Sequence, residues 1–155
     1  MRPGAIPAPA EDRGLYIVWF ELPSLVRARI GSLGEGAFPP GLYAYVGSAQ
    51  VRRTARIRRH LRREKPRRWH IDYLLPQGRP VAVTLCPGAR DQECRLAEQV
   101  LAVTLGRRAH PRFGASDCRC GGHLVAAATR DFGPIAAQID RATGGATAPA
   151  ELWRS

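Results

Sequence analysis

The sequence lacks any long apolar run, has no asparagine and contains a single lysine, Lys65. No window approaches the roughly 20 consecutive apolar residues that a membrane-spanning helix needs, so no membrane span is predicted. The first residues, MRPGAIPAPAEDR, also lack the charged start and apolar centre of a signal peptide. We therefore expect a soluble cytoplasmic protein without a membrane partner.

Cysteine is scarce as well, with only Cys86, Cys94, Cys118 and Cys120 in 155 residues. Four unevenly spaced cysteines do not predict a disulfide framework in a chain of this length, so reduced thiols are expected. The pattern Cys118-x-Cys120-x-x-His123 permits a zinc site, with Cys86 or Cys94 as a fourth ligand. Structural zinc sites usually space paired cysteines two to four residues apart and have a second pair, so buried thiols in a tight loop are the favoured interpretation.

Positive charge, by contrast, is abundant: 24 basic residues against 13 acidic ones give a net charge of +11. Because Lys65 is the only lysine, 23 of the 24 basic residues are arginine. The planar guanidinium binds phosphate through two hydrogen bonds at once, so this composition favours a polyanionic partner. An arginine-rich genome or adaptation to heat would give the same composition, and composition alone does not decide between them.

Chain length and hydrophobic content predict one domain. The 155 residues, 45% of them hydrophobic, are enough to bury a core. We expect this domain to span residues 14–142. Residues 1–13 contain three prolines and no apolar period, and residues 143–155 are rich in glycine, alanine and proline, so both are predicted to be flexible.

Four segments have the pattern of β-strands: residues 14–22, residues 26–33, the segment that begins at Gly41, and residues 79–87. A further short strand is expected at residues 124–129. The first is rich in β-branched and aromatic residues, and the second alternates apolar residues with arginine. Short links between the first three favour an antiparallel meander. The expected fold class is therefore α/β of the α+β type, with a small, mostly antiparallel sheet of three to four strands flanked by helices.

The helix expected at residues 51–63 combines a weak apolar stripe with one ridge of basic side chains. Its members, at positions i, i+4 and i+7, are Arg56, His60 and Arg63. All three could address one ligand. Residues 67–76 predict a short helix or turn packed on the sheet.

The helix expected at residues 91–105 carries a carboxylate on its inward face. Glu93 falls on the same stripe as Ala97 and Val100, which is an unusual place for a glutamate. A last short helix is expected at residues 131–142.

Four motifs follow one another between residues 14 and 100, in the order tyrosine, tyrosine, arginine, glutamate. They are Gly14-Leu15-Tyr16, Tyr45-Val46-Gly47 followed by Ser48-Ala49, Arg56 with His60 one turn later, and Glu93 in Glu93-Cys94-Arg95-Leu96-Ala97. In these motifs the chain resembles the GIY-YIG nuclease superfamily, and the resemblance implies a GIY-YIG-like fold. Many members place an asparagine near the end of the core, but this chain contains no asparagine.

Two later segments narrow the resemblance to a small branch of that superfamily, sometimes fused to endonuclease III-type glycosylases. They are Arg68-Trp69-His70-Ile71-Asp72-Tyr73-Leu74 and Phe113-Gly114-Ala115-Ser116-Asp117-Cys118-Arg119-Cys120, followed by His123 and Leu124. This branch implies a link to DNA repair or processing, with a repair protein as a partner. It assigns no role to the two segments.

The resemblance implies a metal-dependent DNA endonuclease, with RNA as an alternative substrate. It gives catalytic roles to Tyr16, Tyr45, Arg56, His60 and Glu93. Glu93 would hold Mg²⁺ or Mn²⁺, since magnesium keeps several waters and accepts only one or two protein carboxylates. Arg56 would bind the phosphate, and the tyrosines would position and help deprotonate the attacking water. For that purpose a cation such as Arg56 would have to lower a tyrosine pKa from about 10.

Several neighbouring residues are expected to contact the nucleic acid: Arg52, Arg53, Arg59, Arg63 and Ser48. Tyr43, within a second Gly-Leu-Tyr, competes for the role of the first tyrosine, and His70 is an additional candidate that could reach the site from a loop. One short basic helix offers little surface for reading a groove, so structure-selective or partner-guided action is expected.

Each assignment has a structural alternative. Strand tyrosines are commonly core aromatics, an arginine run is commonly a solvated helix face, and Glu93 would interact favourably with its helix dipole. The alternative function is a basic nucleic-acid-binding module without catalysis, which predicts salt-dependent DNA binding without cleavage. A Cys/His metalloprotein unrelated to nucleic acid is a third interpretation.

Overall fold

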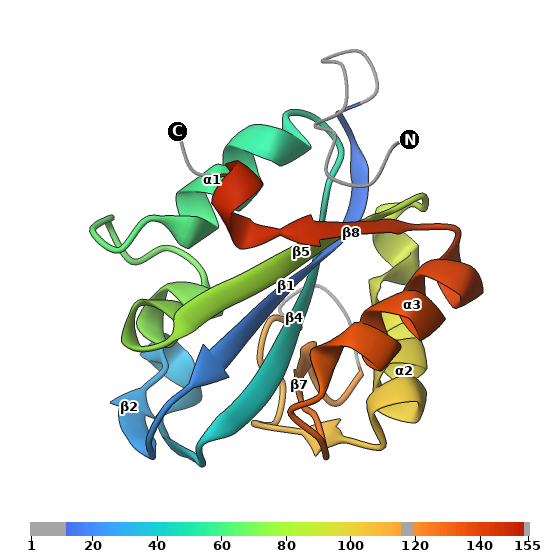
Figure 1. Cartoon of the computed structure of the whole chain (residues 1–155). Helices are drawn as coiled ribbons and strands as arrows, with labels where there is room; N and C mark the ends of the chain where they lie inside the picture. The colour runs from blue at the N-terminus through green and yellow to red at the C-terminus, as the bar shows by residue number, and fades with distance from the viewer. Residues whose placement is uncertain (1–11, 116–119, 154–155) are drawn as a thin grey trace.

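The computed structural model describes residues 12–115 and 120–153, and its central feature is a six-stranded sheet in the order β6-β7-β4-β1-β5-β8 (Figure 1). The strands are β1 Gly14–Leu22, β4 Gly41–Ala49, β5 Arg79–Cys86, β6 Arg107–Arg108, β7 Leu124–Ala126 and β8 Ala146–Pro149. Their pairings are antiparallel. A separate antiparallel hairpin joins β2 (Val26–Arg29) to β3 (Glu35–Phe38).

Helices cover both faces of the sheet. The α-helices are α1 Arg53–Leu61, α2 Glu93–Thr104 and α3 Phe132–Thr143. The 3-10 helices are η2 Gly31–Leu33, η3 His70–Tyr73, η4 Leu75–Gln77, η5 Arg90–Gln92 and η6 Ala150–Trp153. α2 and α3 pack on one face, and α1, η3 and η6 pack on the other (Figure 1).

The central strand β1 shows why the sheet has two cores. Its side chains alternate between the faces, so Leu15, Ile17 and Trp19 pack toward α2 and α3, while Tyr16 and Val18 pack toward α1. All five are buried. The prediction of a strand buried on both faces at residues 14–22 is therefore confirmed.

The mixed, mostly antiparallel fold class is confirmed, but the predicted sheet of three to four strands is too small. Of the additional strands, β7 lies within the short strand expected at residues 124–129, whereas β6 and β8 are two and four residues long, which is too short for an alternating pattern to be recognised. The predicted meander is also wrong. Residues 26–38 form their own hairpin, and the chain then returns so that β4 pairs directly with β1.

The chain end also differs from the predicted flexible tail at residues 143–155. β8 pairs with β5 from Ala146 to Pro149, and Trp153 is buried in the core on the α1 face. A segment of small residues, threonine and proline has no amphipathic period, so the sequence does not reveal this strand. Most of the predicted lead-in, residues 1–11, lies outside the described residues.

Trp153→Ala is expected to lower the free energy of unfolding by about 3–5 kcal/mol, the usual cost of deleting a large buried aromatic side chain. Urea unfolding would measure the change. Leu152→Ala is the matched control, because its side chain is 46% exposed and its removal should cost little. Equal stability of the two variants would show that Trp153 does not hold the chain end against the sheet.

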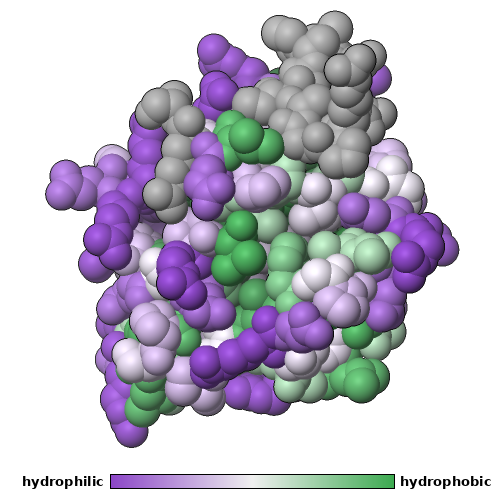
Figure 2. Space-filling model, viewed as in Figure 1, coloured by the Kyte–Doolittle hydropathy of each residue, from purple (hydrophilic) through white to green (hydrophobic). Residues whose placement is uncertain are grey.

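Polar and apolar residues are distributed unevenly over the surface. On the face shown in Figure 2, hydrophilic residues gather toward the rim and hydrophobic residues toward the middle. In the part of the chain that the structure describes, no helix combines the length and the apolar character that crossing a membrane requires.

Candidate active site

A cavity of about 440 Å³ lies where β1, β4, α1 and the start of α2 come together. Its lining residues are Tyr16, Tyr45, Gly47, Ser48, Gln50, Val51, Arg56, Arg68, Trp69, His70, Arg90, Glu93 and Gly114. Four of the five predicted catalytic residues are among them: Tyr16, Tyr45, Arg56 and Glu93. The fifth, His60, lies behind Tyr16.

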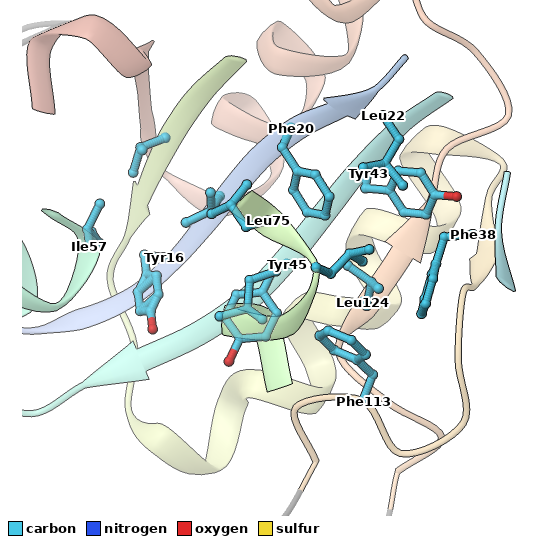
Figure 3. Packing of buried hydrophobic residues seen from close by; sticks show 14 of the residues in the cluster. Tyr16, Phe20, Leu22, Phe38, Tyr43, Tyr45, Ile57, Leu75, Phe113 and Leu124 are labelled. Atoms are coloured by element: carbon cyan, nitrogen blue, oxygen red, sulfur yellow. The ribbon is translucent and has the colours of Figure 1, made fainter. Parts of the chain in front are cut away.

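The register between β1 and β4 sets the two tyrosines side by side. Tyr16 is paired with Gly47, and Tyr45 with Val18, so the tyrosines are diagonal neighbours on one face of the sheet. Both hydroxyl groups point to the same side in Figure 3. A Cβ atom on Gly47 would lie 2.6 Å from Tyr16 Cζ, so the Tyr16 ring occupies the space that a side chain at position 47 would fill.

His60 holds the hydroxyl of Tyr16. The Tyr16 oxygen lies 2.8 Å from His60 Nε2, and both side chains are buried. Burial lowers the pKa of His60 to about 3, assisted by Lys65 and Arg56 and opposed by Asp72. The imidazole is therefore neutral at physiological pH and forms a neutral hydrogen bond with the phenol.

The two tyrosines keep their protons in this environment. Burial is the largest cause that raises the pKa of Tyr16 well above 10, and the neighbouring Tyr45 adds to it, while Arg56 acts in the opposite direction. Burial also raises the pKa of Tyr45, together with Glu93 and Asp72. The expected lowering by Arg56 is therefore present as a contribution, but burial outweighs it.

Arg56 and Glu93 are connected through Ser48. Arg56 Nη1 donates to the backbone oxygen of Ser48 at 2.7 Å, and the hydroxyl of Ser48 donates to Glu93 Oε2. Arg56 also lies 5.1 Å from the centre of the Trp69 ring. These contacts fix a cation and a carboxylate on the wall of the same cavity.

Trp69 and Asp72 account for much of the Arg68–Leu74 segment. Besides Arg56, two further guanidinium groups lie over the Trp69 ring, Arg59 at 4.6 Å and Arg68 at 4.8 Å. Asp72 Oδ2 accepts hydrogen bonds from the backbone N–H groups of Arg68 and Trp69 and from Arg59 Nη1 at 3.0 Å. Asp72 therefore holds the segment that places Trp69 beside the cavity.

The buried carboxylate of Asp72 should make stability dependent on pH. Burial would raise its pKa, but the hydrogen bonds from Trp69, Arg68 and Arg59 outweigh burial and lower it. The carboxylate therefore contributes stability above the unfolded-state pKa of about 3.9, and this contribution is lost as the pH falls through the lower folded-state value.

Asp72→Asn should lower the free energy of unfolding at neutral pH by on the order of 2 kcal/mol, and the loss should shrink below about pH 4. Urea unfolding across this pH range would measure it. Glu98→Gln removes an exposed carboxylate from α2 and serves as the charge-matched control. A constant difference between Asp72→Asn and wild type at every pH would contradict the assignment.

Glu93 is the first residue of α2 and faces both Ser48 and the loop before β7. Its Oε1 lies 3.3 Å from His123 Nδ1, and its side chain is 19% exposed. Burial lowers the pKa of His123, and Arg108 and Arg112 act in the same direction, although Gly114 opposes them. The imidazole of His123 therefore lies directly beside the Glu93 carboxylate.

The structure corrects part of the predicted nucleic-acid contact set. Arg53 is buried and donates to the backbone oxygens of Leu15 at 2.9 Å and Cys86 at 3.2 Å, so it supports the fold. Arg59 is engaged by Asp72 and by the Pro66 oxygen at 2.6 Å. The prediction for Arg53 is therefore wrong, because the burial of a guanidinium cannot be read from an arginine-rich helix. Arg59 is partly exposed, and its contact with nucleic acid stays a prediction.

The other three predicted nucleic-acid contacts, Ser48, Arg52 and Arg63, lie in different places relative to the cavity. Ser48 lines the cavity. Arg52 is exposed and has a left-handed backbone conformation with φ 52° just before α1. Arg63 is exposed beyond the end of α1, beside a second hollow that it shares with Arg62 and Leu61. Arg63 therefore does not share a helical ridge with Arg56.

Of the two additional candidate site residues, His70 lines the cavity and Tyr43 does not. The hydroxyl of Tyr43 donates to the Pro39 oxygen at 2.5 Å, and its ring stacks on Phe20 (Figure 3). Burial raises the pKa of Tyr43 to about 12, and this residue is not among those that line the tyrosine cavity. His70 lines the cavity, and its Nδ1 accepts a hydrogen bond from the Gly114 N–H at 2.7 Å.

Sequence reasoning missed Arg68 and Arg90 as lining residues of the cavity. Both are exposed, so their charges face solvent at its mouth. Arg68 stands beside Trp69 in the Arg68–Leu74 segment, and this position is a signal in the sequence. Arg90 lies in the turn before α2, and its only sequence signal is its position three residues before Glu93.

The fold and the cavity define a small α+β protein whose sheet presents two buried tyrosines, an arginine and a glutamate to one cavity. The chain belongs to the family described as a domain of unknown function, DUF123, which it matches over residues 15–143. No curated protein and no solved structure matches the chain.

Proposed function

We propose that this protein is a metal-dependent DNA endonuclease of the GIY-YIG type that hydrolyses phosphodiester bonds. One observation carries the proposal: Tyr16, Tyr45, Arg56 and Glu93, which come from four different elements or segments, line the same cavity. Core tyrosines, a solvated arginine and a helix-dipole glutamate have no physical reason to converge.

Phosphodiester hydrolysis requires the groups that this cavity brings together. The negative charge of the phosphate repels a nucleophile, and the departing alkoxide is a poor leaving group. A fixed guanidinium neutralises charge at the phosphate, and a second cation near the leaving oxygen would assist departure. The cavity contains the guanidinium of Arg56, and the carboxylate of Glu93 could hold the second cation.

Arg56 is the residue that would bind the phosphate. Its Nη1 donates to the Ser48 oxygen and its side chain also contacts Tyr16, and a guanidinium with five N–H donors can bind a ligand in the cavity beside these contacts. Trp69 supports the guanidinium from one side. The cation would therefore be in place before the substrate arrives, so little reorganisation accompanies the development of charge.

Tyr16 would orient the attacking water. The contact with neutral His60 fixes the direction of its hydroxyl group at the wall of the cavity, where Arg56 lies beside it. Because burial keeps the phenol protonated at rest, its first role is to align the water by hydrogen bonding. Tyr45 would form the neighbouring wall and exclude bulk water.

Glu93 would hold Mg²⁺ or Mn²⁺. Its carboxylate lines the cavity beside Ser48 and His123 and offers the oxygen ligands that a hard cation prefers. A single carboxylate suits magnesium, which commonly keeps several waters. The bound ion would supply charge neutralisation at the scissile phosphate and at the leaving oxygen.

The exposed arginines at the mouth of the cavity would contact the DNA backbone. Arg68 and Arg90 flank it, and the whole chain has a net charge of +11. Backbone contacts position a nucleic acid without reading its sequence, which is consistent with structure-selective action linked to DNA repair or processing.

The test is a nicking assay with purified protein on supercoiled plasmid, branched DNA and single-stranded DNA. Cleavage that appears with Mg²⁺ or Mn²⁺ and disappears with a chelator would support the proposal. Steeply salt-dependent DNA binding without cleavage would instead support the alternative, a basic nucleic-acid-binding module. The raised pKa values of the tyrosines are the observation that favours this alternative.

A further inference from the structure

Three metal-ligating side chains meet outside the tyrosine cavity: Cys94, Cys120 and His123. Their ligand atoms all lie within 4.8 Å of one another. Cys94 is the second residue of α2, whereas Cys120 and His123 belong to the loop that leads into β7. The fold brings them together across 29 positions of sequence between Cys94 and His123.

We propose that Cys94, Cys120 and His123 bind a zinc ion that fastens the loop before β7 to the start of α2. Two thiolates and an imidazole are soft and borderline donors of the kind that zinc prefers, and they do not suit magnesium. The site is therefore chemically distinct from the carboxylate of Glu93 in the neighbouring cavity.

The distances suit a tetrahedral ion. Zinc–sulfur bonds of about 2.3 Å and zinc–nitrogen bonds of about 2.0 Å place sulfur and nitrogen about 3.5 Å apart, and two sulfurs about 3.8 Å apart. Cys94 Sγ lies 3.4 Å from His123 Nε2. An ion could bind between these atoms after only small side-chain movements.

The backbone already holds the His123 ligand in position. The N–H of His123 donates to the Phe113 oxygen at 2.6 Å, and its oxygen accepts from the Val46 N–H at 2.9 Å. The same loop is closed by Arg112, whose N–H donates to Gly121 and whose Nη1 donates to the Cys120 oxygen at 3.0 Å. Cys94 is carried by the first turn of α2, where the helix dipole stabilises a negatively charged thiolate.

Glu93 completes the pattern as a partner of the imidazole. A histidine that binds zinc through one nitrogen usually donates its other N–H to a carboxylate or carbonyl group. Here Nε2 faces Cys94, and Nδ1 lies 3.3 Å from Glu93 Oε1. A zinc ion would thus fix the tautomer of His123 and, through it, the orientation of Glu93.

The structure selects Cys94 over Cys86 as the cysteine that joins the Cys120–His123 loop. Cys86 lies at the end of β5 and donates to Thr143 Oγ1 at 3.6 Å. Cys118 lies outside the described residues. Cys94, His123 and Glu93 also line a cavity of about 750 Å³, which gives an ion a route to the site and room for a further ligand.

The first experiment measures zinc in the full chain, purified from zinc-supplemented cells and dialysed without chelator. Atomic emission should find about one zinc per chain, and cobalt substitution should give a thiolate-to-metal charge-transfer band. Cys94→Ser and Cys120→Ser should each lose most of the zinc. Cys86→Ser is the matched control and should retain it.

A second measurement needs no variant. Thiol alkylation followed by peptide mapping should show Cys94 and Cys120 protected by zinc and exposed after treatment with a strong chelator. Glu93→Gln should weaken zinc binding by roughly 10–100-fold, as expected for loss of a histidine partner.

The proposal is overturned if the wild type binds neither zinc nor cobalt, or if Cys94→Ser retains as much zinc as Cys86→Ser. Unchanged zinc affinity in Glu93→Gln would overturn the link between the ion and Glu93. None of these measurements involves DNA, so a zinc protein without nuclease activity and a nuclease without zinc would be told apart.

Discussion

Arg56→Ala should reduce metal-dependent DNA cleavage by at least roughly 10²–10³-fold, the usual cost of removing a fixed group that stabilises transition-state charge. The guanidinium is held by Ser48 and Trp69 on the wall of the cavity, whereas Arg59 of the same helix lies over Trp69 without lining the cavity. Arg56→Lys should recover little, because an ammonium cannot keep the Ser48 contact and bind phosphate through a planar fork. The measurement is the single-turnover rate on a nicked or branched substrate.

Glu93→Ala should be as severe, since it removes the carboxylate that would hold the catalytic ion. Because Glu93 also contacts His123, its zinc content must be measured in the same preparation. Loss of cleavage with zinc retained would assign the defect to the catalytic ion. Arg56→Ala is free of this ambiguity, as Arg56 does not contact the Cys/His cluster in any described interaction.

Arg141→Ala provides the charge-matched control for Arg56→Ala. Arg141 is exposed in the last turn of α3, on the opposite face of the sheet from α1. It should cleave like the wild type. Equal cleavage by wild type, Arg56→Ala and Glu93→Ala would indicate a contaminating nuclease and would contradict the proposed function.

The abundance of arginine now has two explanations of different kinds. Arg53 and Arg59 are committed to backbone oxygens and to Asp72, and Arg59 also lies over Trp69. A lysine could not replace these planar contacts. Part of the net charge therefore serves the fold, while Arg68 and Arg90 remain exposed at the mouth of the cavity.

Local patterns in the sequence were sufficient to predict the secondary-structure elements that carry the site residues. The strand at residues 14–22, the arginine-rich helix and the inward position of Glu93 each depend on a contiguous stretch of chain, and the structure has all three. The order of the four motifs then predicted which residues would meet.

What could not be predicted depends on contacts between distant segments. The start of α1 after Arg52 is capped from outside, because Asp12 Oδ1 accepts from the N–H and hydroxyl of Thr54 at 2.8 Å. No periodicity links positions 12 and 54. The meeting of Cys94 with His123 is of the same kind, since it follows from the path of the chain between α2 and β7.

The register between β1 and β4 is the hardest of these features to predict from the sequence, and it matters most for the geometry of the site. A shift by one residue would move Tyr45 to the opposite face of the sheet from Tyr16. Instead Tyr16 lies across Gly47, in the Tyr45-Val46-Gly47 motif. The glycine is thus required by the packing of the first tyrosine on the second strand.

Gly47→Ala should therefore damage both stability and activity. The new Cβ would lie 2.6 Å from Cζ and Oη of Tyr16, whose ring is buried and whose hydroxyl is held by His60. Relief requires the ring to move, at a cost of about 1–3 kcal/mol for an overpacked core, and moves the hydroxyl away from His60. Urea unfolding and the cleavage rate would measure the two effects.

Gly133→Ala is the matched control, because a Cβ at that position in α3 meets no atom within 4 Å. It should leave stability and cleavage unchanged or slightly improve stability, since alanine favours a helix over glycine.

A double-mutant cycle separates the clash from a general intolerance of side chains at position 47. In a Tyr16→Ala background the ring is gone, so Gly47→Ala should cost at least about 1 kcal/mol less than it does in the wild type. Equal costs in the two backgrounds would show that Gly47 is required for a reason other than Tyr16. The predicted coupling ties the glycine of the second motif to the tyrosine of the first, and hence the strand register to the geometry of the cavity.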